Sequence, residues 1–190
     1  MTAPRIIAGR LKGRKLDVPA DGSVRPTASR MREALFSMVT PQVVGCRFLD
    51  LFSGTGAVGF EACSRGAREV VFVEQARQAT IAIKRNATAL DCLDMIRIVQ
   101  GDATLLRTGT GAFDIVFADP PYGTGLAAPA FARLLASGAI TTGARLFAEL
   151  AAREPFDPPD GLAQVDERRF GAGRLIELEA VNDPRVQSFE

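Results

Sequence analysis

From Arg47 onward, short apolar segments alternate with segments of helical spacing, and this order constrains the fold more than any other feature. The predicted strands and the helices between them follow a regular β–α order, with strands at 48–52, 70–73, 95–99, 113–118 and 145–150, and helices at 57–65, 76–90 and 127–136. This order favours a parallel sheet with helices on both faces. The sequence therefore predicts an α/β fold with a doubly wound, Rossmann-like sheet.

Both ends of the chain depart from this alternation. Two further strands are expected at 164–170 and 174–180 across a glycine-rich turn, forming a terminal antiparallel hairpin. At the start, strands at 5–8 and 14–18 flank a turn and predict a small N-terminal β-hairpin, followed by a loop at 19–26. Thr27 is expected to cap a helix that ends before Pro41. We thus expect a basic arm at 1–25 and one main domain at 26–190.

Composition narrows the class of protein. The chain has 190 residues, of which 47% are apolar, so it can bury the core of one domain. No apolar run approaches the ~18 residues that span a membrane, and the three cysteines form no CxxC pair. The chain has no histidine, which excludes histidine-dependent nucleophilic catalysis and removes a common metal ligand. We expect a cytoplasmic monomer without a metal.

Charge is distributed unevenly along the chain. Residues 1–40 contain eight Lys or Arg and three acidic residues, whereas residues 41–190 have a net charge of −4. A basic segment ahead of an acidic body is typical of contact with a polyanion. A solvated basic face explains the same charge equally well, so charge alone leaves both interpretations open.

Polar residues follow three of the predicted strands in a pattern that suits an adenosine cofactor. The first segment has the GxGxxG spacing at Gly54, Gly56 and Gly59, and its expected ligand contacts are Asp50, Phe52, Ser53, Gly54, Thr55 and Gly56. Glu74, followed by Gln75, can accept hydrogen bonds from ribose hydroxyls. Asp102, followed by Ala103, can accept one from the adenine amino group. These signals fit NAD and S-adenosylmethionine alike.

The segment Asp119-Pro120-Pro121-Tyr122, after the strand at 113–118, distinguishes the two cofactors. Proline restricts its own backbone and that of the preceding residue, so the Asp119 carboxylate and the Pro120 carbonyl form two fixed acceptors. Two acceptors match the two N–H groups of a base amine, and Tyr122 offers a face for stacking the base. Hydride transfer has no use for this arrangement, whereas transfer of a methyl group to an amine does. We therefore assign Asp119 to both the catalytic and the cofactor site.

The motifs together resemble a known family. The glycine turn and the Asp-Pro-Pro-Tyr segment are similar to those of class I amino-methyltransferases. The segments at 5–16 (RIIAGRLKGRKL) and 24–36 (VRPTASRMREALF) resemble the signature of bacterial 16S rRNA guanine-N2 methyltransferases of the RsmD type. Ala28-Ser29 departs from that pattern, in which Thr/Ser-Asp is usual.

The resemblance implies S-adenosylmethionine as cofactor, with S-adenosylhomocysteine as product. It also implies N2-methylguanine in small-subunit rRNA as the modified nucleotide, with the RNA presented in a 30S particle or assembly intermediate. Candidate RNA contacts are Arg5, Arg10, Lys12, Arg14, Lys15, Arg25, Thr27, Arg30 and Arg32. Two alternatives remain open at this point: a DNA adenine-N6 methyltransferase, and an RNA-binding assembly factor without activity.

Overall fold

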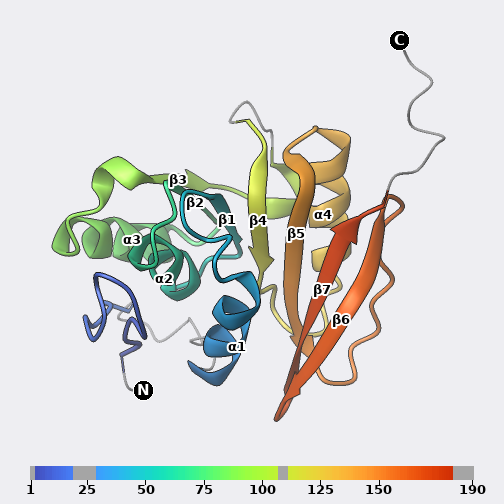
Figure 1. The fold of residues 1–190 in the computed structure, drawn as a ribbon, viewed down its shortest axis with the longest axis horizontal. Coiled ribbons are helices and arrows are strands. Elements are labelled where there is room, and N and C mark those ends of the chain that lie inside the picture. Colours follow the sequence, from blue (N-terminus) through green and yellow to red (C-terminus); the bar gives the residue numbers. More distant parts are fainter. Residues whose placement is uncertain (1–2, 19–28, 107–110, 182–190) are drawn as a thin grey trace.

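The computed structural model describes residues 3–18, 29–106 and 111–181 (Figure 1). The elements follow the β–α order in the chain: α1 (Ser29–Val39), β1 (Arg47–Leu51), α2 (Ala57–Ser64), β2 (Glu69–Glu74), α3 (Arg77–Ala89), η1 (Leu93–Met95), β3 (Ile96–Gln100), η2 (Ala103–Leu105), β4 (Phe113–Ala118), α4 (Ala127–Ala136), β5 (Ile140–Ala151), β6 (Leu162–Phe170) and β7 (Gly173–Ala180). Each predicted strand and helix of residues 47–180 is present, within a few residues of its expected bounds.

One seven-stranded sheet has the order β3-β2-β1-β4-β5-β7-β6. The first five strands in this order pair in parallel, and β7 joins β5 and β6 in antiparallel fashion. The doubly wound sheet and its terminal antiparallel hairpin are therefore confirmed. β5 starts five residues earlier than predicted, because its first residue pairs with Phe113 ahead of an irregularity in the register.

Helices cover both faces of the sheet (Figure 1). The face covered by α1, α2 and α3 buries aromatic residues such as Phe36, Phe48, Phe60 and Phe72. The opposite face buries smaller and branched residues against Phe131 and other residues of α4. Successive strand residues point to opposite faces, so a strand buried on both sides must be apolar at nearly every position. The strands β1, β2 and β4 meet this requirement, since apart from Asp50 and Asp114 their inner positions are apolar.

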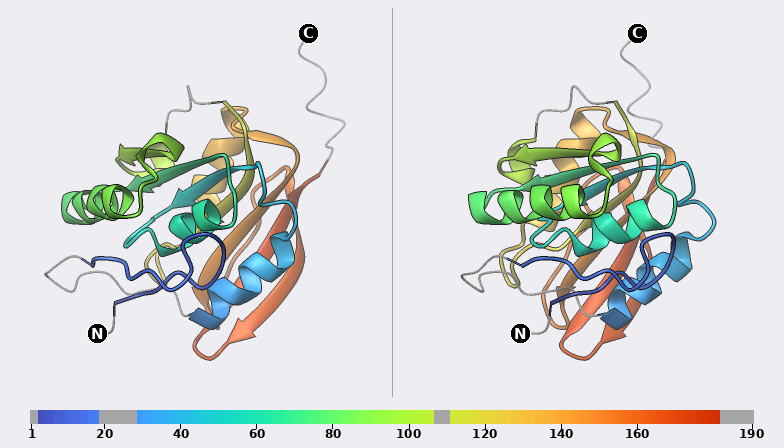
Figure 2. Two further views of the ribbon diagram at one scale, coloured as in Figure 1. Left: turned by 60° about the vertical axis from the view of Figure 1, so that its left-hand side comes forward. Right: turned by 90° about the vertical axis from the view of Figure 1, so that its left-hand side faces the viewer.

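The expected N-terminal hairpin is present with little regular pairing. Residues 5–8 and 14–18 form no named strands, but an antiparallel bridge joins Arg5 to Lys15, and backbone hydrogen bonds run from Ile6 to Arg14 at 3.0 Å and from Leu16 to Pro4 at 2.9 Å. The arm also packs onto the domain and buries Ile6, Leu11 and Leu16 in the same core as α1 and α2. Figure 2 shows the arm, in dark blue, lying along α2 and beside α1. The division at residue 25 falls outside the described residues and stays a prediction.

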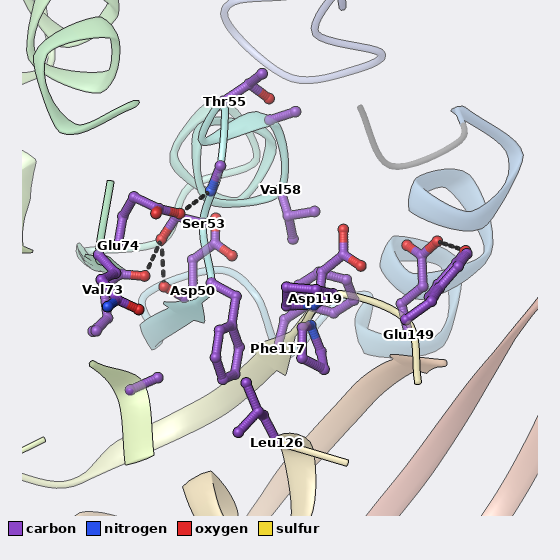
Figure 3. A pocket seen from close by; sticks show the side chains of 18 of the residues that line it. Asp50, Ser53, Thr55, Val58, Val73, Glu74, Phe117, Asp119, Leu126 and Glu149 are labelled. Carbon is purple, nitrogen blue, oxygen red and sulfur yellow. Dashed lines mark hydrogen bonds between the residues drawn. The ribbon is translucent and has the colours of Figure 1, made fainter. Parts of the chain in front are cut away.

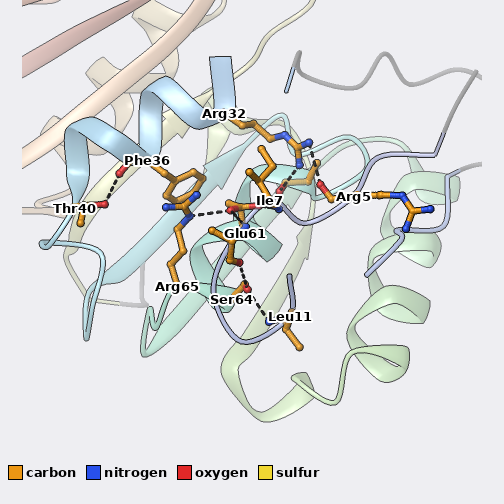
Figure 4. A network of polar contacts seen from close by, with 11 residues as sticks. Arg5, Ile7, Leu11, Arg32, Phe36, Thr40, Glu61, Ser64 and Arg65 are labelled. Carbon is orange, nitrogen blue, oxygen red and sulfur yellow. Dashed lines mark hydrogen bonds and ion pairs between the residues drawn. The ribbon is translucent and has the colours of Figure 1, made fainter. Parts of the chain in front are cut away.

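Side chains of helix α2 accept hydrogen bonds from backbone N–H groups of the arm (Figure 4). The fully buried Glu61 carboxylate accepts the backbone N–H groups of Ile7 at 2.7 Å and Ala8 at 2.9 Å, and pairs with Arg65 at 2.8 Å. Ser64 accepts the N–H of Leu11 at 2.9 Å. A backbone N–H that is withdrawn from water must find an acceptor, and these side chains supply acceptors for arm N–H groups in addition to the arm's own antiparallel pairing.

Gly9 allows the close approach of the arm to α2. Its φ is +79°, and a Cβ at this position would lie 2.0 Å from the backbone oxygen of Ser64. Any side chain here would both strain the backbone and separate the arm from the helix.

Among the described residues, no helix combines the length and the apolar character needed to cross a membrane.

We expect Glu61→Ala to lower the free energy of unfolding by about 3 kcal/mol, because it leaves two buried N–H groups and the Arg65 guanidinium without their acceptor. Urea unfolding followed by circular dichroism measures this change. Glu33→Ala, on the exposed side of α1, is the matched control and should shift stability by no more than about 0.5 kcal/mol. Equal effects of the two variants would contradict the proposed anchoring of the arm.

Candidate active site

A cavity of about 650 Å³ opens at the carboxyl ends of the parallel strands. Nearly every residue predicted for the cofactor and catalytic sites lines it, namely Asp50, Phe52, Ser53, Gly54, Thr55, Glu74, Gln75, Asp102, Ala103, Asp119, Pro120, Pro121 and Tyr122. The fold therefore brings together segments that are separated by up to about seventy residues in the sequence. Gly56 does not line the cavity, although it was expected to contact the ligand.

The carboxylates of the cavity follow a repeated pattern in four neighbouring strands. Each strand has phenylalanine two positions before an acid, in the pairs Phe48–Asp50, Phe72–Glu74, Phe117–Asp119 and Phe147–Glu149. Residues two apart point to the same face, so each ring lies in the core directly below a carboxylate. In the register, Asp50 is level with Phe72 and Phe117, so it lies two residues deeper in the sheet than Glu74 and Asp119.

The glycine turn after β1 is held by its own backbone and by β2. The Ser53 hydroxyl donates to the Asp50 carbonyl at 2.6 Å, and Gly56 has a φ of 74° that turns the chain into α2. Phe52 also has a positive φ, of 57°, which is uncommon for a residue with a side chain and often marks a functional turn. A Cβ on Gly59 would lie 2.2 Å from the Phe72 ring, so this glycine allows α2 to pack closely on the sheet.

Asp50 joins the floor of the cavity to the start of α2. Its carboxylate accepts the Gly59 N–H at 2.9 Å and is only 2% exposed. Burial raises the pKa of the Asp50 carboxyl well above its usual range, against the lowering effect of the Gly59 hydrogen bond, and the charges of Asp119 and Glu74 raise it further. Asp50 therefore holds the first turn of α2 in place through a hydrogen bond that is shielded from solvent.

The Glu74 carboxylate is held in a fixed orientation at the end of β2 (Figure 3). Its two carboxylate oxygens accept the backbone N–H groups of Gly54 at 2.8 Å and Ala76 at 2.7 Å. Each oxygen has a second lone pair, so the carboxylate can also accept two hydroxyl groups on the cavity side. The vicinal hydroxyls of a ribose match this donor requirement.

Asp102 occupies the far rim of the cavity, where it begins η2. One carboxylate oxygen accepts the Thr104 hydroxyl at 2.7 Å and the Thr104 N–H at 2.8 Å. These two hydrogen bonds lower the pKa of the exposed Asp102 carboxyl. The group is therefore ionised at neutral pH, as an acceptor for an adenine amino group must be.

Asp119 and Tyr122 lie where β4 ends. The Asp119 N–H donates to the Leu51 carbonyl at 3.3 Å, which continues the pairing with β1 up to the catalytic segment. The Tyr122 hydroxyl donates to Oε1 of Glu149 at 2.9 Å. Tyr122 is 37% exposed and lines the cavity, as stacking on a base requires.

Two acidic residues of the site were not predicted from the sequence. Glu149 lines the cavity from β5. Glu154, which is also buried, accepts the N–H groups of Gly123 at 2.9 Å and Gly125 at 3.3 Å, and so holds the loop that follows Tyr122. The repeated Phe-x-acid pattern could have identified Glu149, whereas nothing in the sequence pattern points to Glu154.

The proposed RNA contacts fall into three groups. Those exposed on the arm and α1 are Arg5, Arg10, Lys12, Arg14, Lys15 and Arg30. Arg25 and Thr27 lie outside the described residues. Arg32 is a correction: it is 1% exposed, and its guanidinium donates to the Arg5 carbonyl at 3.2 Å, so it joins α1 to the arm and is not available for a phosphate.

Among the described residues, no group of three or more acids and cysteines is arranged to hold a metal ion.

Asp50→Asn tests the raised pKa. As pH rises above the ordinary aspartate range, the unfolded chain releases this proton before the native protein does, so the wild type loses stability. The variant lacks this loss, so its stability relative to the wild type should rise as the pH increases above about 4, the ordinary pKa of an aspartate, by roughly 1.4 kcal/mol per unit of pKa difference. Urea titrations at several pH values measure the trend, with exposed Asp160→Asn as control. Parallel stability curves would be inconsistent with a raised pKa.

Comparison with known proteins gives the family. The family model described as "Conserved hypothetical protein 95" matches residues 4–179. A relative from Haemophilus influenzae, ribosomal RNA small subunit methyltransferase D, is 33% identical over 171 residues, which are 88% of this chain and 89% of the relative. The corresponding protein of Escherichia coli is 40% identical over 124 residues, covering 64% of this chain and 62% of the relative.

Solved structures agree with this assignment. A putative methyltransferase from Escherichia coli superposes with a TM-score of 0.82 at 30% identity, covering 94% of this chain and 98% of that protein. A putative methylase from Haemophilus influenzae gives the same TM-score at 28% identity, covering 95% and 100%. The resemblance in the sequence motifs is therefore confirmed, and the chain belongs to the Conserved hypothetical protein 95 family of RsmD-type methyltransferases.

Proposed function

We propose that this protein transfers a methyl group from S-adenosylmethionine to the exocyclic N2 of a guanine in small-subunit ribosomal RNA. The observation that carries the proposal is the meeting of the glycine turn and the Asp119–Tyr122 segment in one cavity. One part suits an adenosine cofactor and the other suits a planar amine. The names of the relatives supply the substrate, because two of them are small-subunit rRNA methyltransferases.

The lining residues fit S-adenosylmethionine. Glu74 and Asp102 are carboxylate acceptors at two separate positions of the cavity, as ribose hydroxyls and an adenine amino group require. Phe52 and Leu126 add apolar surface beside them. We assign the adenosine to this part of the cavity, and the methyl donor to the part nearer Asp119.

Catalysis in this proposal consists of positioning and matched electrostatics. When bound, S-adenosylmethionine supplies an electrophilic methyl group on a sulfonium. Asp119 and the Pro120 carbonyl accept the two N–H groups of the target amine and orient its nitrogen, while Tyr122 stacks on the base. A bond from N2 to the methyl carbon forms as the sulfur–methyl bond breaks. We assign the proton that N2 then loses to the Asp119 carboxylate, which already accepts that N–H.

The target guanine must leave its stack to reach these groups. The exposed arm residues Arg5, Arg10, Lys12, Arg14 and Lys15 are our candidates for holding the flanking phosphates, together with Arg30 on α1. Arg30 directly precedes Met31, which lines the cavity, so this part of α1 connects the basic surface with the site. We further propose that the protein acts in the cytoplasm as a monomer, on RNA presented in a 30S particle or assembly intermediate.

Asp119→Ala should reduce turnover by at least about a hundred-fold while S-adenosylmethionine still binds, because the amine loses one of its two acceptors. Single-turnover methyl transfer and calorimetric cofactor titration measure the two effects separately. Asp160→Ala, which changes an exposed acid away from the cavity, should leave both unchanged. Near-normal turnover in Asp119→Ala would refute the proposed role of the carboxylate.

The proposed reaction is tested with tritiated S-adenosylmethionine and three substrates: unmethylated small ribosomal subunits, naked rRNA and duplex DNA. Nucleoside analysis of the labelled product should find N2-methylguanosine from the subunits. Label in N6-methyladenine from DNA would transfer the protein to the other class of amino-methyltransferase. Cofactor binding without label in any substrate would favour an assembly factor without activity.

A further inference from the structure

Glu149 is placed beside the catalytic aspartate by the register of the sheet. Ala118 of β4 pairs with Ala148 of β5, so the next residues, Asp119 and Glu149, are neighbours on adjacent parallel strands. Adjacent strands lie about 4.8 Å apart, and residues in register point to the same face. Figure 3 shows both carboxylates extending to the same side of the cavity.

The surroundings of Glu149 are rigid and include the residue assigned to base stacking. Glu149 is 5% exposed and pairs with Leu175 of β7, and the residue before it, Ala148, pairs with Ala118 of β4. Its Oε1 accepts the Tyr122 hydroxyl at 2.9 Å. A Cβ on Gly173 would lie 3.0 Å from that hydroxyl, so the absence of a side chain there leaves the space in which Tyr122 reaches Glu149.

The purine bases differ in the hydrogen bonds that they offer to such a carboxylate. Guanine presents two adjacent donors, N1–H and the N2 amine, whereas adenine presents an acceptor at N1 beside its amine. A carboxylate in its ionised form only accepts hydrogen bonds and has about four lone-pair positions, so it can accept the Tyr122 hydroxyl and a further donor at the same time. A second carboxylate next to Asp119 therefore complements the guanine edge and repels an unprotonated N1.

We infer that Glu149 determines the base specificity of the enzyme by accepting the N1–H of guanine, while Asp119 and Pro120 hold N2. This inference rests on the proposed function and deepens it. It also bears on the adenine-N6 alternative, because an adenine amine placed at Asp119 would present the lone pair of N1 to the Glu149 carboxylate. A site that bonds a donor discriminates strongly against an analogue lacking it, because its own buried group loses a partner.

The rival explanation is that Glu149 only positions Tyr122. Glu149→Gln separates the two roles, because the amide oxygen still accepts the Tyr122 hydroxyl while the charge is removed. The amide can also donate to an unprotonated N1. A purely positioning residue would leave the preference between bases unchanged in this variant.

The experiment compares guanine with 2-aminopurine, which keeps the 2-amino group but has no hydrogen on N1, at the position mapped by the labelling assay. Wild-type kcat/KM should favour guanine by about ten- to a hundred-fold. Glu149→Gln should bring the two substrates to within a few-fold of each other. Glu179→Gln, an exposed residue of β7, is the matched control and should keep the wild-type ratio.

Equal use of both bases by the wild type would overturn the inference, and so would an unchanged ratio in Glu149→Gln. Cofactor affinity measured by calorimetry reports whether the variant is folded. If it is not, Tyr122→Phe decides between the two roles: it removes the hydroxyl that Glu149 would position but keeps the Glu149 carboxylate, so the inference predicts the wild-type ratio, and loss of the preference would overturn it. Absence of label on guanine from every wild-type substrate would instead refute the proposed function, and the inference with it.

Discussion

The register of the central parallel strands is the constraint on which the rest of the structure depends. Because β2, β1, β4 and β5 are paired in parallel, their carboxyl ends meet at one edge, and four acids that are far apart in sequence face one cavity. A shift of one residue in any strand would turn its acid to the other face and place the preceding apolar residue in the site. The phenylalanine two residues before each acid opposes such a shift, since it is buried in the core.

Helix α2 connects the two halves of the proposed function. At its first turn, Asp50 accepts the Gly59 N–H and fixes the helix to the floor of the cavity. At its far side, Glu61 and Ser64 hold the basic arm. The same short helix therefore contacts both the cofactor turn and the arm that we assign to RNA.

The sequence predicts the parallel sheet and most of the cavity, because short apolar segments and the polar residues at strand ends are local signals. It predicts the paired arm but not how the arm is anchored, since the carboxylate that accepts the arm N–H groups is Glu61, about fifty residues away. Arg32 was placed with the exposed residues of its helix, yet it lies four residues before the buried Phe36 and shares its stripe. Glu149 was missed because no glycine or proline follows it to mark a functional turn.

The central claim, that a single cavity holds cofactor and target base side by side, is tested most directly by a crystal structure with S-adenosylhomocysteine. The account predicts a ribose on the Glu74 carboxylate and the amino-acid portion of the ligand toward Asp119, with the part of the cavity lined by Tyr122 and Glu149 left open for a base. Ligand density away from Glu74, or density that fills the space beside Glu149, would contradict it.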